Sequence, residues 1–184
     1  MDAWVWIVIA MAALAIIVIA VLAWLQTRRR RLRETFGPEY ERAVADAPTR
    51  KEAEAELEER RKRREELEIR PLSPETAERY GHEWEGVQVR FVDDPVGATR
   101  DADRLVQQVM SDRGYPMDEF DARADLISVD HPTVVENYRK AHTAYLAYDR
   151  GDASTEDLRQ AMVHYRSLFD ELVESGERTH EEVG

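Results

Sequence analysis

Residues 3–25 read AWVWIVIAMAALAIIVIAVLAWL, a run of 23 positions without a charge or a strongly polar side chain. As an α-helix this run extends about 35 Å, because each residue advances the helix by about 1.5 Å. The hydrocarbon core of a bilayer is roughly 30 Å thick, so the helix crosses it with a modest tilt. Trp4 and Trp6 lie near one end and Trp24 at the other, where indole rings favour the headgroup layer. The sequence therefore predicts a transmembrane anchor over residues 1–27.

A cleaved signal peptide is the main alternative for this run. Such a peptide needs a basic start and a shorter apolar stretch of about 7 to 15 residues. Here only Met1 and Asp2 precede a longer stretch, and the small-residue pattern at Ala10 to Ala12 lies in its middle. An uncleaved anchor is the favoured interpretation.

Five arginines follow the apolar run within six positions: Arg28, Arg29, Arg30, Arg31 and Arg33. Because cytoplasmic flanks of membrane helices are enriched in Lys and Arg, the cluster predicts a cytoplasmic C-terminal side and an external N-terminus. The reverse orientation, with an extracytoplasmic C-terminal domain, stays open as the alternative. Together with Trp4, Trp6 and Trp24, these arginines form the predicted membrane-interface set, and anionic lipid is their expected partner.

Residues 28–70 are predicted to form the basic juxtamembrane segment and a charged helical stalk. Pro38 is suited to the first turn of a helix, and Thr49 with Glu52 has the spacing of a capping box. Pairs such as Glu56 with Arg60, at i and i+4, support a solvated helix. Apolar positions are too few for a sustained coiled-coil seam, although association of copies through the stalk is left open.

Residues 72–174 carry the pattern of a small bundle of about four main helices, and residues 175–184 form a polar tail. Ser73 before Pro74, and Asp94 before Pro95, are typical helix starts, and Gly114 is typical of a helix end. The predicted helices have apolar stripes at spacings of three and four, including Tyr80, Trp84, Val87 and Phe91, then Leu105, Val106 and Val109, then Tyr138, Ala141 and Tyr145, and finally Leu158, Met162, Tyr165 and Phe169. We therefore expect an all-α fold consisting of anchor, stalk and bundle.

The charge distribution bears on the class of partner. The chain has a net charge of −12; residues 1–70 contribute +1, and residues 71–184 contribute −13 from 12 basic and 25 acidic side chains. An acidic domain repels phosphate backbones, so nucleic-acid binding is not expected. The absence of cysteine excludes disulfides and thiolate metal sites.

No pattern in the sequence indicates catalysis, a cofactor or a metal. His131 and His142 are eleven residues apart, which on one helix separates them by about 16 Å. His164 supplies a second neighbour at best, without a third ligand. The acidic clusters lack the alternating ligands and central glycine of a calcium loop, and no phosphate loop or activated nucleophile is present. We expect a non-enzymatic protein without catalytic, cofactor or metal residues.

Several stretches resemble a known group of proteins: residues 91–95 (FVDDP), 102–106 (ADRLV), 113–116 (RGYP), 129–132 (VDHP) and 164–169 (HYRSLF). They are similar to those of uncharacterised actinobacterial single-pass membrane proteins, often described as secreted, that have a C-terminal helical domain. That group has no established function, so the resemblance implies an architecture and no activity.

The expected function is a protein-interaction or scaffolding module held at the cytoplasmic membrane surface, with an unknown protein partner. One alternative is an anchored sensor domain for a small ligand or metal, with a pocket among Tyr80, Trp84, Tyr115, Tyr138 and Tyr165. Another is a structural envelope protein that self-associates.

Overall fold

The computed structural model describes residues 3–174 of the chain. Within this range the chain forms helices joined by turns, without a strand, and the all-α expectation is confirmed. The helices are α1 (Ala3–Phe36), α2 (Pro38–Asp46), α3 (Arg50–Glu65), α4 (Pro74–Arg90), α5 (Pro95–Arg113), α6 (Phe120–Asp130), α7 (Val135–Asp149) and α8 (Thr155–Glu174). The chain divides into two compact units, Met1–Glu58 and Glu59–Gly184. The polar tail predicted over residues 175–184 lies outside the described residues.

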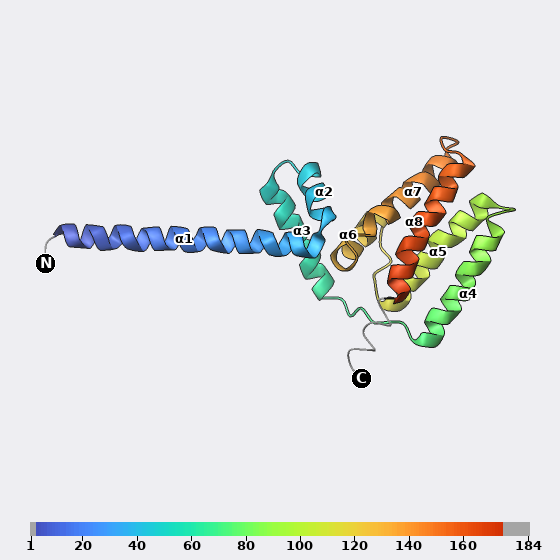
Figure 1. Ribbon diagram of the computed structural model, residues 1–184, viewed down its shortest axis with the longest axis horizontal. Helices are drawn as coiled ribbons and strands as arrows, with labels where there is room; N and C mark the ends of the chain where they lie inside the picture. The colour runs from blue at the N-terminus through green and yellow to red at the C-terminus, as the bar shows by residue number, and fades with distance from the viewer. Residues whose placement is uncertain (1–2, 175–184) are drawn as a thin grey trace. The chain divides into compact units, whose positions relative to one another are not determined.

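Helix α1 contains the apolar run and continues without interruption through the arginine cluster to Phe36 (Figure 1). Among the described residues it provides one stretch, Met11–Phe36, that is long and apolar enough to cross a membrane. None of the most apolar part of this stretch is buried against the rest of the protein. A helix that exposes so much apolar surface suits a lipid environment better than water.

The first unit has a small core beyond the apolar run. Gly37 has a φ of +47°, which ends α1, and Pro38 starts α2. The buried apolar side chains of α1, α2 and α3 are Leu32, Phe36, Tyr40, Ala43, Ala53 and Leu57. The segment expected to be a solvated stalk thus has a buried side at Ala53 and Leu57. These two positions are one turn apart on α3, so they share one face of the helix.

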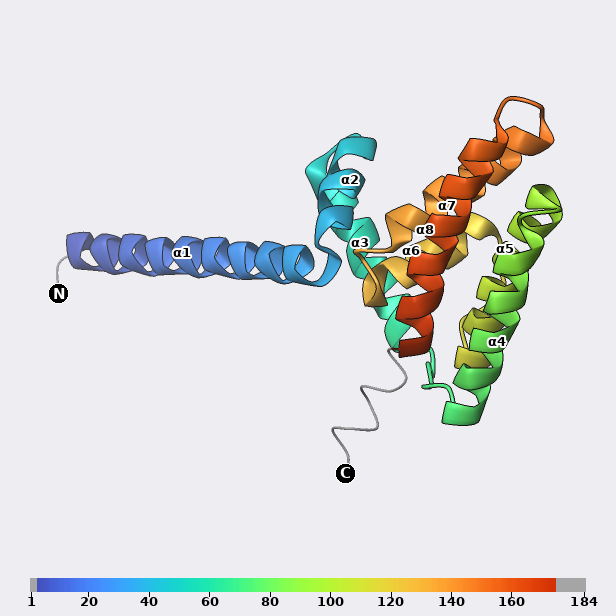
Figure 2. The same ribbon diagram turned by 45° about the vertical axis from the view of Figure 1, so that its right-hand side comes forward.

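The second unit contains the bundle. Helices α7 and α8 pack together, α8 also packs on α5, and α5 packs on α4, so the spatial order is α7, α8, α5, α4 (Figures 1 and 2). The short helix α6 packs on α7. Large side chains with almost no exposed surface fill the interior, among them Trp84, Met110, Ile127, Tyr138, Tyr165 and Leu168. Four long helices therefore bury one another's apolar stripes.

The predicted starts of α4 and α5 and the predicted end of α5 are confirmed. The Ser73 hydroxyl accepts a hydrogen bond from the Thr76 amide at 3.2 Å, and the Asp94 carboxylate accepts one from the Gly97 amide at 2.9 Å. Gly114 ends α5 with a φ of +97°, in the left-handed region that favours glycine. A Cβ at this position would lie 2.7 Å from the carbonyl oxygen of Glu68. Both the conformation and the close backbone approach require glycine here.

Candidate functional site

The predicted interface tryptophans all lie on α1 with exposed side chains. Trp4, Trp6 and Trp24 are 64%, 58% and 62% exposed. The Arg28 guanidinium lies 5.9 Å from the centre of the Trp24 ring, a cation–π contact between the last aromatic residue and the first arginine. The apolar run and the basic cluster are therefore directly connected on one continuous helix.

The five arginines divide into two groups. Arg29 pairs with Glu54 of α3 at 3.1 Å, Arg33 with Glu41 of α2 at 3.0 Å, and Arg30 with Glu34 of its own helix at 2.7 Å; these pairs occupy three of the five cations. For the other two, Arg28 and Arg31, the described part of the chain provides no ion pair.

Glu54 is the centre of the contacts in this first unit. Glu54 is buried, with 8% of its surface exposed. The carboxylate oxygen that pairs with Arg29 also accepts a hydrogen bond from the Tyr40 hydroxyl at 2.9 Å. Burial and the hydrogen bond to Glu54 raise the pKa of Tyr40. One carboxylate on α3 thus connects α1 and α2.

The five aromatic residues that were predicted to line a pocket are all buried in the bundle core, and they are spread through it. The Tyr80 hydroxyl donates to Asp112 at 2.7 Å, and the Tyr115 hydroxyl donates to Asp130 at 2.5 Å. Trp84 stacks on Phe169, while Tyr138 and Tyr165 meet edge to face at 6.3 Å between ring centres. These side chains fill the space between helices, which is the usual role of an aromatic stripe.

A polar cluster lies inside the bundle where α5, α6, α7 and α8 meet. It contains buried polar atoms of five side chains: Asp103, Arg123, Tyr138, His142 and Tyr165. Burial and the negative charge of Asp103 raise the pKa of Tyr165, and burial raises that of Tyr138 to about 12. Burial lowers the pKa of His142, whose ring stacks on Phe120 at 3.8 Å.

These pKa directions set the charge state of the polar cluster near pH 7. Both tyrosines are protonated and His142 is neutral. Within the described residues, no group of three or more His, Asp or Glu side chains could hold a metal ion.

A second, better-satisfied polar network lies at the end of the bundle where α5 ends. The Arg113 guanidinium, 7% exposed, donates to the Leu172 carbonyl at 2.8 Å and to the Arg70 carbonyl at 3.3 Å. The Asp130 carboxylate accepts from Tyr115 and from Arg64. We call these contacts, with the His131–Glu171 pair at 3.3 Å, the basal network. It joins the end of α3, the α5–α6 loop, α6 and α8.

The stretches that carry the actinobacterial resemblance have structural roles here. Residues 113–116 and 129–132 supply the basal network, and 91–95 include the Asp94 cap. Residues 102–106 and 164–169 contribute core positions of α5 and α8. These five stretches thus contribute to the packing of the bundle. The resemblance to the actinobacterial proteins stays a prediction.

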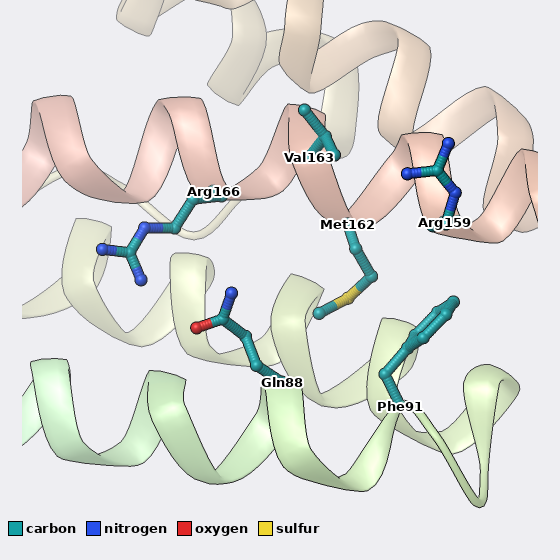
Figure 3. A pocket seen from close by; sticks show the side chains of 6 residues that line it. All are labelled: Gln88, Phe91, Arg159, Met162, Val163 and Arg166. Atoms are coloured by element: carbon teal, nitrogen blue, oxygen red, sulfur yellow. The ribbon is translucent and has the colours of Figure 1, made fainter.

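An open groove lies between α4 and α8, with a volume of 260 Å³. Its lining consists of Gln88 from α4, Phe91 at the C-cap of α4, and Arg159, Met162, Val163 and Arg166 from α8 (Figure 3). Phe91 is half-buried, Met162 is nearly buried and Val163 is 54% exposed. We call this the α4–α8 groove.

The two arginines of the groove are each held by a carboxylate of their own helix. The Arg159 guanidinium donates two hydrogen bonds to Glu156, at 2.6 and 2.8 Å. Arg166 pairs with Asp170 at 2.7 Å and lies 5.5 Å from the centre of the Trp84 ring. In Figure 3 the two guanidinium groups lie towards opposite ends of the groove, with Met162 and Val163 between them. The groove therefore has an apolar centre and cationic ends.

Comparison with protein-family models, curated proteins and solved structures gives no match.

Proposed function

We propose that this chain is a membrane-anchored, non-enzymatic helical module that presents its bundle to a protein partner at the cytoplasmic membrane surface. The observation that carries the proposal is the combination of an unburied apolar helix with a bundle that has its own core and an open groove. An anchor limits the bundle to the membrane surface, and a groove with an apolar centre is a common form of protein-binding surface.

The arginines support the proposed orientation. Five basic side chains directly after the apolar run favour the cytoplasmic side for everything that follows. The structure adds a consequence for lipid binding. Arg28 and Arg31 are three residues apart on one face of α1 and are the best suited to anionic headgroups, whereas Arg29 and Arg33 pair with Glu54 and Glu41.

Native mass spectrometry of the chain in detergent mixed with anionic lipid tests this division. A double variant of Arg28 and Arg31 to glutamine should retain fewer anionic lipids than the matched double variant of Arg29 and Arg33, because each available basic residue contributes about 1 kcal/mol. Equal lipid loss in the two variants would contradict the division.

Photo-crosslinking in the membrane tests the interaction function itself. A photoreactive amino acid is introduced at exposed sites on different faces of the bundle, Val163 on α8 and Glu136 on α7, in the full chain. We expect a discrete protein adduct from one face, retained when the apolar run of α1 is replaced by polyleucine. Failure of both positions to form any protein adduct would refute the proposal. An adduct with the mass of two copies would instead favour the self-associating envelope protein.

A further inference from the structure

The spacing of the α8 residues gives the α4–α8 groove a regular pattern. Arg159, Met162, Val163 and Arg166 stand at positions i, i+3, i+4 and i+7, so they share one face of the helix. The two arginines are seven residues apart, which is about 10.5 Å along the axis. Gln88 of α4 and Phe91 at its C-cap form the opposite wall (Figure 3).

The charge of the groove differs from that of the domain around it. Residues 71–184 have a net charge of −13, yet the lining has two arginines and no carboxylate. The acids that hold these arginines lie one turn away on the same helix; Glu156 is exposed and Asp170 is partly buried. An exposed pair such as Arg159–Glu156 contributes only about 0 to 1 kcal/mol, so the Arg159 guanidinium can be shared with a partner at little cost.

We propose that the α4–α8 groove binds an amphipathic helix of a partner protein, in which apolar side chains are flanked by carboxylates about seven residues apart. Apolar side chains of such a helix would cover Phe91, Met162 and Val163, and its carboxylates would meet Arg159 and Arg166. A single-headed amphiphile such as a fatty acid matches only one of the two cationic ends. This inference rests on the proposed interaction function and specifies the kind of partner.

The test uses the full chain in lipid nanodiscs and a synthetic helical peptide of about 14 residues. The length gives about four turns, which cover the groove with a margin at each end. The core of the peptide reads Glu-Ala-Ala-Leu-Leu-Ala-Ala-Glu, and the control peptide has lysine in place of both glutamates. Binding is measured by fluorescence anisotropy of the labelled peptide. We expect saturable binding of the glutamate peptide and weaker binding of the lysine peptide.

Arg159→Glu is the informative variant, because Arg159 is exposed and pairs only locally with Glu156. This variant should weaken binding of the glutamate peptide by about threefold to tenfold, since the attraction between Arg159 and a peptide glutamate becomes a repulsion. For the same reason it should strengthen binding of the lysine peptide. Lys140→Glu is the matched control, because Lys140 is an exposed cation that pairs with Glu136 one turn away on α7. It should leave both affinities unchanged, and an unfolding curve verifies that each variant is folded.

Three outcomes would overturn the inference: equal binding of the two peptides, an equal effect of Arg159→Glu and Lys140→Glu, or binding of dodecanoate without binding of either peptide. A crosslinked protein adduct from Glu136 and none from Val163 would leave the interaction function intact and reject this groove as its site. Failure of the inference and failure of the proposed function are thus distinguishable.

Discussion

Replacing Asp130 by asparagine tests the basal network, because this one carboxylate oxygen accepts from two groups distant in the sequence. The Tyr115 hydroxyl donates to Asp130 at 2.5 Å, and the Arg64 guanidinium donates to the same oxygen. The Asp130 side chain is 23% exposed, so solvent weakens these contacts only in part.

The expected loss follows from the number and type of these contacts. Hydrogen bonds to a charged group contribute about 1.5 to 3 kcal/mol each, and asparagine keeps the shape and one acceptor while losing the charge. We therefore expect the free energy of unfolding to fall by about 2 kcal/mol. With a urea dependence of about 1.5 kcal/mol per molar, the unfolding midpoint should decrease by about 1.3 M.

The assay is urea unfolding of the full chain in mild detergent, followed by the fluorescence of Trp84. The three tryptophans of α1 are replaced by phenylalanine in every sample, so the signal comes from the bundle. Asp118→Asn, at an exposed position, is the matched control. A midpoint shift below about 0.3 M for Asp130→Asn would refute the role of the network, as would a coupling with Tyr115→Phe below about 0.5 kcal/mol.

Three further predictions concern single positions and use the same unfolding assay or hydrogen exchange. Gly114→Ala should cost about 1 to 3 kcal/mol, because the residue needs a positive φ and its Cβ would approach the Glu68 carbonyl; an unchanged midpoint would contradict this strain. Burial, together with the positive charge of Arg113, lowers the pKa of His131. The unfolded chain therefore binds this proton first, and stability should fall as the pH drops below about 6.5, less steeply in His131→Gln; parallel pH profiles would count against it. Leu57→Ala should speed amide exchange in α2 and α3 by local destabilisation of about 2 to 4 kcal/mol, whereas equal exchange rates would place Leu57 outside a core.

The local features of the fold could be predicted from the sequence. Ser73 reaches the amide of Thr76, and Asp94 that of Gly97, so both partners of each cap lie within one short window. The apolar run of α1 is likewise a property of consecutive residues. Patterns of this range follow from backbone geometry alone.

The contacts between distant elements could not be predicted in this way. Arg64 and Asp130 are 66 positions apart, and their pairing depends on how the helices pack. The sequence also gave no signal that α3 has a buried side, because Ala53 and Leu57 are too few to define a stripe. Their burial comes from tertiary packing, which two apolar positions do not reveal.

The α4–α8 groove has a similar explanation. Phe91 and Met162 were correctly expected on the apolar faces of their helices, but a stripe does not reveal whether a neighbouring helix covers it fully. Arg159 and Arg166 have acidic neighbours at i−3 and i+4, as ordinary solvent-exposed arginines do. The groove depends on how α4 and α8 pack in the folded bundle, and the pattern of either helix alone does not predict it.

A pair of reporters fused after Gly184 tests the central claim most directly, namely that α1 holds the bundle at the cytoplasmic surface of a membrane. One reporter is an enzyme active only outside the cytoplasm, and the other is a protein that fluoresces only inside. We predict a fluorescent fusion and an inactive enzyme fusion, both recovered in the membrane fraction. An active enzyme fusion, or recovery of the chain without the membrane, would contradict the account.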